Sequence, residues 1–451
     1  MSRKVLVNDF TSGSIFKQLI FFSAPLMLSG ILQTSYNIVD IAVVGRAVGS
    51  NCLSGVSIGG DITHTLLFFA IGFSNAGQVL IAQQLGAKKM DQVGKTVGNL
   101  ITFLLAVAIG LSILAIIFRK QILVWMNTPP EAWDYAWSYV TIAFIGTVFV
   151  YGYNLIGAIL RGMGDSTHPL LFIVIATVIN IILDILFVNV FSLGAGGVAL
   201  ATTIAQGVSF IWALLFLYKK RNELGFKIVP KSFVLEKHTL MPIIKLGIPM
   251  ALQSALINLS RMFVLSNINS YGITAAAISS IGSKVDNAAV IITNSINTAG
   301  ASLIGQNIGA GKYDRVKQII AREFIFCGAV CAVMILVLVI FPKAIFGLFI
   351  SEAVLIEEAM VYIPVAVVGI LSCAARQPMM SLIYGSGVTK MNLFVALFDG
   401  VVARIGLSLV LAELFNMGLS GYWYGNAFSG FVPLFIGGIF FLSGKWKTKV
   451  E

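Results

Sequence analysis

The chain carries the same set of residues twice, about 223 positions apart. The repeated residues lie in short polar or glycine-containing segments that interrupt otherwise apolar sequence. The first set is Gln83, Gly86, Ala87, Lys89, Asp91, Val93, Gly162 and Gly164, and the second is Gln306, Gly309, Ala310, Lys312, Asp314, Val316, Gly385 and Gly387. Pro25 and Pro249 stand at corresponding places, one residue out of register. Such a chain is expected to fold as two related halves.

The sequence between these repeated segments is too apolar for a water-soluble protein. Of its 451 residues, 58% are hydrophobic and only 11% are charged, whereas soluble domains carry about 25% charge. Spanning a bilayer takes about 20 apolar residues per helix. We therefore predict an all-α integral membrane protein with twelve transmembrane helices in two homologous six-helix bundles. The predicted helices cover residues 15–45, 53–84, 96–118, 133–160, 169–191, 196–218, 240–270, 273–305, 319–341, 354–384, 392–413 and 418–443.

The basic residues predict the orientation of these helices. The net charge is +11, but most Lys and Arg fall in alternate loops, which is the positive-inside pattern rather than a nucleic-acid-binding surface. An even number of helices then places both termini in the cytoplasm. We expect a first bundle at 1–222, a cytoplasmic linker at 223–239 and a second bundle at 240–451.

Motifs for ATP-driven transport and for catalysis are missing from the sequence. The nearest match to a phosphate-binding loop is Gly94-Lys95-Thr96, but Lys89 stands where that loop needs a glycine. The three histidines are scattered, and they are His64, His168 and His238. We expect no enzymatic activity, no cofactor and no metal apart from a possible sodium ion. Transport would then draw its energy from an ion gradient.

Repeated sets of membrane helices are typical of secondary transporters, whose substrate site lies between the repeats. A carboxylate within a membrane helix is costly and indicates a functional site. Three helix faces of the first half combine such acids with other oxygen-bearing side chains. They are Gln33, Tyr36, Asn37 and Asp40 in the first helix, Asn180 and Asp184 in the fifth, and Thr202 and Gln206 in the sixth. Their convergence would suit a proton or a small hard cation, and the alternative is that both acids are structural.

The second half has a different set of charged residues within its helices. It consists of Arg261, Lys284, Asp286, Arg376, Asp399 and Arg404. These residues could form internal salt bridges, or some of the cations could line the cavity and set the charge preference for substrate. In the first half, Pro25 removes a backbone hydrogen bond, so it could let the first helix bend, or it could be a packing kink.

Several segments resemble the multidrug and toxic compound extrusion (MATE) family of secondary exporters. The resemblance extends over both halves and rests on motifs that occur in the family's order. They are YNIVD at 36–40 followed by VG at 44–45, AQQLGA at 82–87, AILRGMGDST at 158–167 and GVALAT at 197–202. It implies a V-shaped pair of bundles that alternates between outward-open and inward-open states. It also implies a monomer in the bacterial inner membrane that exports organic, often cationic, compounds in exchange for protons or sodium.

The resemblance also implies roles for individual residues. In members with an ion site in the first half, that site matches Asp40, Asn180, Asp184 and Thr202. Tyr36 and Asn154 match positions near the substrate cavity. Members with a second-half sodium site carry a glutamate in the seventh helix, but the residues here are Gln253, Leu256 and Ile257. A second-half sodium site is therefore not expected.

Two other functions remain possible at this stage. A flippase for lipid-linked sugars belongs to the same superfamily, although those relatives often have additional helices and a strongly cationic cavity. A channel or receptor would be a membrane protein without transport by alternating access, and the internal repeat argues against it. Ethidium efflux that stops when the ion gradient collapses would separate the exporter from both.

Overall fold

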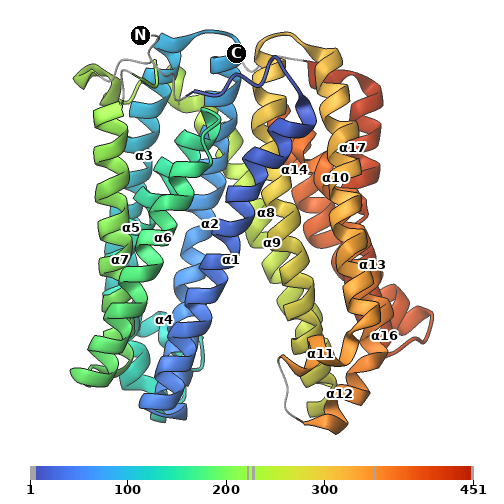
Figure 1. Cartoon of the computed structure of the whole chain (residues 1–451). Coiled ribbons are helices and arrows are strands. Elements are labelled where there is room, and N and C mark those ends of the chain that lie inside the picture. Colours follow the sequence, from blue (N-terminus) through green and yellow to red (C-terminus); the bar gives the residue numbers. More distant parts are fainter. Residues whose placement is uncertain (1–6, 221–222, 226–228, 349–351, 448–451) are drawn as a thin grey trace. The chain divides into compact units, whose positions relative to one another are not determined.

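A computed structural model describes residues 7–220, 223–225, 229–348 and 352–447. These residues form helices joined by short turns and no strand (Figure 1). Within them, twelve helical stretches are long and apolar enough to cross a membrane. The prediction of an all-α protein with twelve transmembrane helices is confirmed.

The long helices account for all twelve stretches, five of which contain a change of helix type or a short break. In the first half they are α1 (Ile15–Ala47), α2 (Ser50–Gly86), α3 (Met90–Ile117), α5 (Trp133–Gly162), α6 (Thr167–Asp184) and α7 (Gly194–Lys220). In the second half they are α8 (Lys237–Asn269), α9 (Ile273–Gly309), α10 (Tyr313–Ile340), α13 (Ile363–Ser386), α14 (Thr389–Leu397), α15 (Arg404–Leu409), α16 (Leu419–Ser429) and α17 (Val432–Ser443).

Shorter helical elements lie at the ends of the long helices or between them. The α-helical ones are α4 (Arg119–Trp125), α11 (Pro342–Gly347) and α12 (Ala353–Ala359). The 3-10 turns are η1 (Pro130–Ala132), η3 (Pro230–Phe233), η4 (Met360–Tyr362) and η7 (Lys445–Lys447). The π-helical turns are η2 (Ile185–Val190), η5 (Phe398–Ala403) and η6 (Val410–Leu414).

The sequence repeat corresponds to a repeat in packing. In the first half, Gly162 lies against Ile81, and at the equivalent place in the second half Gly385 lies against Ile304. In each pair the glycine has no room for a Cβ atom, so the helices approach more closely than other residues would allow. The equivalent turns after α5 and α13 also use a left-handed glycine, with φ of 86° at Gly164 and 69° at Gly387.

The chain forms two compact units whose boundaries differ from the predicted halves. The first unit contains residues 1–9 and 24–251, and the second contains 10–23 and 252–451. The beginning of α1 therefore belongs to the second unit, and the beginning of α8 belongs to the first. Pro25 and Pro249 each lie within two residues of the point where their helix changes units.

Each exchanged segment is held by polar contacts in the unit to which it belongs. In the second unit, the Phe10 amide donates to Gln306 Oε1 at 2.9 Å and its carbonyl accepts from Asn307 Nδ2 at 3.0 Å. In the first unit, α8 follows a stretch that Asn99 binds, since Asn99 Nδ2 donates to the Val234 carbonyl at 3.1 Å and Asn99 Oδ1 accepts from the Glu236 amide at 2.8 Å. Within α8, Gly247 then packs against the ring of Phe73.

Candidate functional site

The first unit brings the predicted ion-binding residues together. Asp40 of α1 is 8% exposed, and Asn180 and Asp184 of α6 are 2% and 0% exposed. The Asp40 carboxylate interacts with Asp184, Asn180 and Thr202. Asn180 Nδ2 donates to Thr202 Oγ1 of α7 at 3.3 Å. The three helix faces identified from the sequence therefore meet in one buried polar cluster.

The cluster contains more acceptors than donors. Four of its oxygens have no hydrogen-bond partner among the described residues, and they are Asp40 Oδ1, Asn180 Oδ1, Asp184 Oδ1 and Asp184 Oδ2. Two ionised carboxylates cannot hydrogen-bond to each other, because neither has a proton to donate. The arrangement can be satisfied by a proton shared between the acids or by a small cation that the oxygens surround.

Three of the five residues predicted for a substrate cavity lie in this cluster or next to it, and they are Gln33, Tyr36 and Gln206. Tyr36 is close to Asp40, and its hydroxyl interacts with Gln206. One turn earlier on α1, Gln33 interacts with Tyr153 of α5. Asn37 lies on the exposed side of α1. The fifth residue, Asn154, donates to the carbonyl of Val150 in its own helix at 2.8 Å, and no contact of its side chain with the cluster is found among the described residues.

Tyr139 of α5 is a neighbour of the cluster that the sequence did not indicate. Its hydroxyl interacts electrostatically with Asp40, Tyr36 and Asp184. Its ring packs against Gly59 of α2, where a side chain would occupy the same space. The repeat could have drawn attention to it, because Tyr362 packs against Gly282 at the equivalent place in the second unit.

A π-helical turn begins directly after Asp184. The chain passes from α6 into η2 at Ile185, and such turns occur frequently at functional sites because they disturb the regular backbone hydrogen bonds. In the second unit, the turn η5 contains Asp399. In both units, therefore, an intramembrane aspartate lies at or beside a π-helical turn.

In the second unit, Asp399 forms the centre of a salt-bridge network. Its carboxylate lies 3.1 Å from Arg376 Nη2 and 3.7 Å from Arg404 Nη2. Arg404 also donates to the Asn426 side chain. Asp399 is 0% and Arg404 2% exposed. Of the two interpretations of the second-half charges, internal salt bridging accounts for these three residues.

The remaining charged residues of that set are arranged differently. Asp286 of α9 accepts a hydrogen bond from the Tyr362 hydroxyl at 2.9 Å. Arg261 of α8 interacts electrostatically with Asp286 and Asp399, but it forms no ion pair within 4.0 Å among the described residues. Lys284 lies on an exposed side of α9. Arg261 is therefore a cation of this set that has no ion pair among the described residues and can influence the charge preference for a ligand.

The helix α1 continues through Pro25 without a break. The Pro25 carbonyl accepts a hydrogen bond from Ser29 Oγ at 2.8 Å, which places a side chain in the helix turn next to the proline. Proline itself cannot donate to the carbonyl one turn earlier. The backbone of α1 therefore lacks one helical hydrogen bond fifteen residues before Asp40, where the helix passes from one unit to the other.

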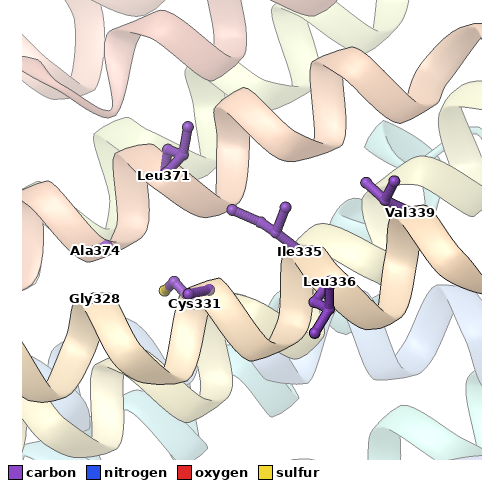
Figure 2. A pocket seen from close by; sticks show the side chains of 8 residues that line it. Gly328, Cys331, Ile335, Leu336, Val339, Leu371 and Ala374 are labelled. Atoms are coloured by element: carbon purple, nitrogen blue, oxygen red, sulfur yellow. The ribbon is translucent and has the colours of Figure 1, made fainter.

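An apolar hollow in the second unit is separate from these polar clusters. It measures about 360 Å³ and lies between α10 and α13 (Figure 2). Its lining consists of Gly328, Cys331, Ala332, Ile335, Leu336, Val339, Leu371 and Ala374. None of the predicted site residues lines it. Its composition matches that of a surface in contact with lipid.

Comparison with known proteins agrees with this architecture. The family model MatE matches residues 25–186 and again 249–410, so each match begins at one of the two prolines. A structure described as the outward-facing conformation of a multidrug resistance MATE family transporter has a TM-score of 0.91. It is 19% identical, and the alignment covers 100% of this chain and 99% of that chain.

Curated bacterial relatives are similar over most of their length. The probable multidrug resistance protein YpnP of Bacillus subtilis (strain 168) is 32% identical over 76% of this chain and 76% of its own. The probable multidrug resistance protein YoeA of the same organism is 28% identical over 97% of this chain and 95% of its own. Together with the two family-model matches, these similarities show that the chain belongs to the MATE family of multidrug efflux transporters.

Proposed function

We propose that this protein exports organic, often cationic, compounds by alternating access, in exchange for protons or sodium ions. The observation that supports this most strongly is the buried cluster of Asp40, Asn180, Asp184 and Thr202 with its unpartnered oxygens. A site of this kind binds a small cation but offers nothing to a nucleophilic or redox reaction. We propose that no cofactor takes part.

The exchange follows from competition for Asp40. When Asp40 is ionised, its face with Tyr36 and Asn37 attracts a cationic compound. When a proton or sodium ion neutralises the cluster, that attraction weakens and α1 can bend at Pro25. A ligand shifts a conformational equilibrium only through its different affinities for the two states. The ion and the compound would therefore favour different states of the transporter.

A membrane potential supplies enough energy for this exchange. One elementary charge that moves through 100 mV releases about 2.3 kcal/mol. At one charge per cycle, this supports roughly fifty-fold accumulation of the exported compound. Either coupling ion fits the cluster, because the carboxylates can take up a proton and the carboxylate and amide oxygens can coordinate a hard cation.

We further propose that the protein acts as a monomer in the plasma membrane of a bacterium, with both termini in the cytoplasm. The bacterial relatives and the twelve membrane-spanning stretches support the location. The basic loops support the orientation.

The proposed function can be tested with purified protein in proteoliposomes. A pH gradient and a sodium gradient are imposed separately, and uptake of ethidium against its own gradient is followed by fluorescence. We expect one of the two gradients to drive transport in the wild type and neither to drive it in Asp40→Asn. Transport that is equal with and without both gradients would contradict the proposal.

A flippase for lipid-linked sugars is the second candidate, because Arg261, which forms no ion pair within 4.0 Å among the described residues, could bind the phosphate group of such a lipid. Against it, Asp399 already neutralises much of the charge of Arg376 and Arg404. Transfer of a fluorescent lipid-linked sugar across the membrane, without ethidium transport, would favour this candidate.

A further inference from the structure

Glu323 is a buried acid of the second unit to which neither the sequence motifs nor the proposed ion site assigns a role. It lies on α10 and is 0% exposed. Ser381 of α13 donates to its Oε1 atom, while Oε2 has no hydrogen-bond partner among the described residues. No ion pair with Glu323 is found in the same part of the chain. The carboxyl group is therefore far from water and is not neutralised by a basic side chain.

The repeat shows that the fold does not need an acid here. The equivalent residue of the first half is Leu100, which is also 0% exposed. Leu100 packs against Gly77, and Glu323 packs in the same way against Gly300. A leucine thus fills this space in one copy of the fold. Burial of a carboxyl group in place of a hydrocarbon side chain has a free-energy cost, and intramembrane acids with such a cost usually serve a function.

Other residues in this part of the second half are also more polar than their equivalents in the first half. Ser381 stands where the first half has Ala158, and Thr293 stands where it has Ala70. Asn297 replaces a serine, Ser74. Asn297 Nδ2 donates to Ser381 Oγ at 3.2 Å. A hydroxyl and an amide group thus accompany the acid, which makes the second copy polar where the first is packed with apolar or smaller side chains.

The hydrogen bonds of Ser381 can accommodate both protonation states of Glu323. Besides the carboxyl group, Ser381 Oγ lies 3.1 Å from the Asn297 carbonyl and 3.1 Å from the Gln377 carbonyl. When Glu323 is ionised, the serine can donate its proton to the carboxylate. When Glu323 is protonated, the acid can donate to Ser381 Oγ, and the serine can donate to a backbone carbonyl instead. Gain or loss of a proton then leaves no donor without an acceptor.

Few other ionisable groups lie near enough to affect this proton. Cys327, one turn further along α10, interacts electrostatically with Glu323. On α13, Cys373 interacts with Cys327, and Arg376 is paired with Asp399. On α9, Gly300 packs against the acid and has no side chain, and Asn297, which donates to Ser381, carries no charge. Among the described residues, no charged side chain is therefore paired with the Glu323 carboxyl group.

We propose that Glu323 is a second proton-binding site, which takes up one proton from water and releases it again during the transport cycle. It lies ten residues into α10, about 15 Å along the helix from its first residue, and the basic residues at that end indicate exchange with the cytoplasm. Its part in the cycle rests on the proposed function. In this step the Glu323 carboxylate and one proton form the carboxylic acid, and no other group changes.

Infrared spectroscopy of the purified protein in lipid nanodiscs tests the site without measuring transport. We expect the wild type to show a carbonyl stretch from a buried carboxylic acid that disappears as the pH is raised. Glu323→Gln and Glu323→Leu should lack this band, and the leucine variant, which restores the residue of the first half, keeps the packing. Ser381→Ala should keep the band but shift its frequency.

A band that is absent from wild type, or that stays constant over the whole pH range in which the protein is folded, would overturn the proposal, because Glu323 would then be a permanent structural group. A transport measurement provides a second test of the proposal. In proteoliposomes, Glu323→Gln should move one proton fewer per exported molecule than the wild type, and an unchanged stoichiometry would also overturn the proposal. If the wild type does not transport ethidium at all, the proposed function fails while the spectroscopic result still stands.

Discussion

The intramembrane acids differ in what neutralises them. Asp40 and Asp184 face each other, and no basic side chain forms an ion pair with either among the described residues. Asp399 lies between two arginines. Glu323 has only the Ser381 hydroxyl. Substitution of each acid by its amide should therefore have different consequences, although all four lie within the membrane-spanning helices.

Asp40→Asn and Asp184→Asn should each abolish gradient-driven efflux. The amide has the shape of the acid but cannot exchange a proton and attracts a cation only weakly, so coupling is lost while packing is kept. Efflux of ethidium from cells and the amount of protein in the membrane are measured together. Normal efflux in Asp40→Asn, with loss of efflux in Asp399→Asn, would place the ion site in the second unit instead.

Asp399→Asn should affect stability more than coupling. Removal of one member of a buried ion pair leaves uncompensated charge, and this costs roughly 3–5 kcal/mol. Arg376 and Arg404 would both lose their carboxylate partner. We expect a clear decrease in the melting temperature of the purified protein, followed by tryptophan fluorescence, with Asp40→Asn as the control. An unchanged melting temperature would show that the network contributes little to the fold.

Part of the site could be predicted from residue spacing. Positions four apart share a helix face, so Asn180 and Asp184 were predicted to lie together, and charge within apolar sequence identified Asp40. Tyr139 could not be found from residue spacing or charge, and only the repeat, which places Tyr362 at the equivalent position, could have indicated it. Glu323 did carry a signal, which is the comparison of the two repeats, since an acid stands there in place of Leu100.

At the scale of elements, α1 and α8 have the same arrangement of a proline near the boundary between the two units. Each of α1 and α8 begins in one unit and ends in the other, and each contains a proline within two residues of the crossing. Because a proline leaves one backbone carbonyl without its helical donor, bending at this point breaks fewer hydrogen bonds than bending elsewhere. At the crossing points, α1 and α8 therefore each have a place where bending breaks fewer hydrogen bonds.

Pro25→Ala should restore the missing hydrogen bond and stiffen α1. We expect the variant to bind ethidium as well as the wild type but to export it several-fold more slowly, because the cluster at Asp40 is unchanged while the bend is opposed. Binding by fluorescence anisotropy and efflux in proteoliposomes are compared. Pro249→Ala is the matched control on α8, which carries no ion-site residue. Wild-type efflux in Pro25→Ala would mean that the proline is only a packing feature.

The helices themselves were largely predictable, but their assignment to units was not. Apolar length predicts a membrane span wherever it occurs, and all twelve spans were found. Hydropathy does not say which neighbours a helix packs against. The exchange of 10–23 and of the start of α8 depends on contacts such as those of Phe10 with Gln306 and Asn307, which no periodicity reveals.

At the scale of the whole molecule, charge placement predicts the orientation in the membrane. The basic residues gather at alternate ends of the twelve spans, and by the positive-inside rule we expect those ends to face the cytoplasm. Two of these ends can be examined directly. Lys231 in η3 and Lys312 before α10 are both exposed.

Single cysteines at Lys231 and Lys312, introduced after replacement of the four native cysteines, should report the orientation. We expect a membrane-impermeant maleimide to label neither in intact cells and both in inverted vesicles. A cysteine at Glu131, in the loop predicted to face outward, is the control and should be labelled in intact cells. Labelling of Lys231→Cys or Lys312→Cys from outside would contradict the proposed topology.

Competition between the coupling ion and the exported compound at Asp40 can be measured directly. The affinity of purified protein for a fluorescent cationic compound is determined over a range of pH and of sodium concentration, for the wild type and for Asp40→Asn. We predict that affinity in the wild type weakens as the pH falls or as sodium rises, and that this dependence is lost in Asp40→Asn. Wild-type affinity that is indifferent to both ions would contradict exchange at Asp40.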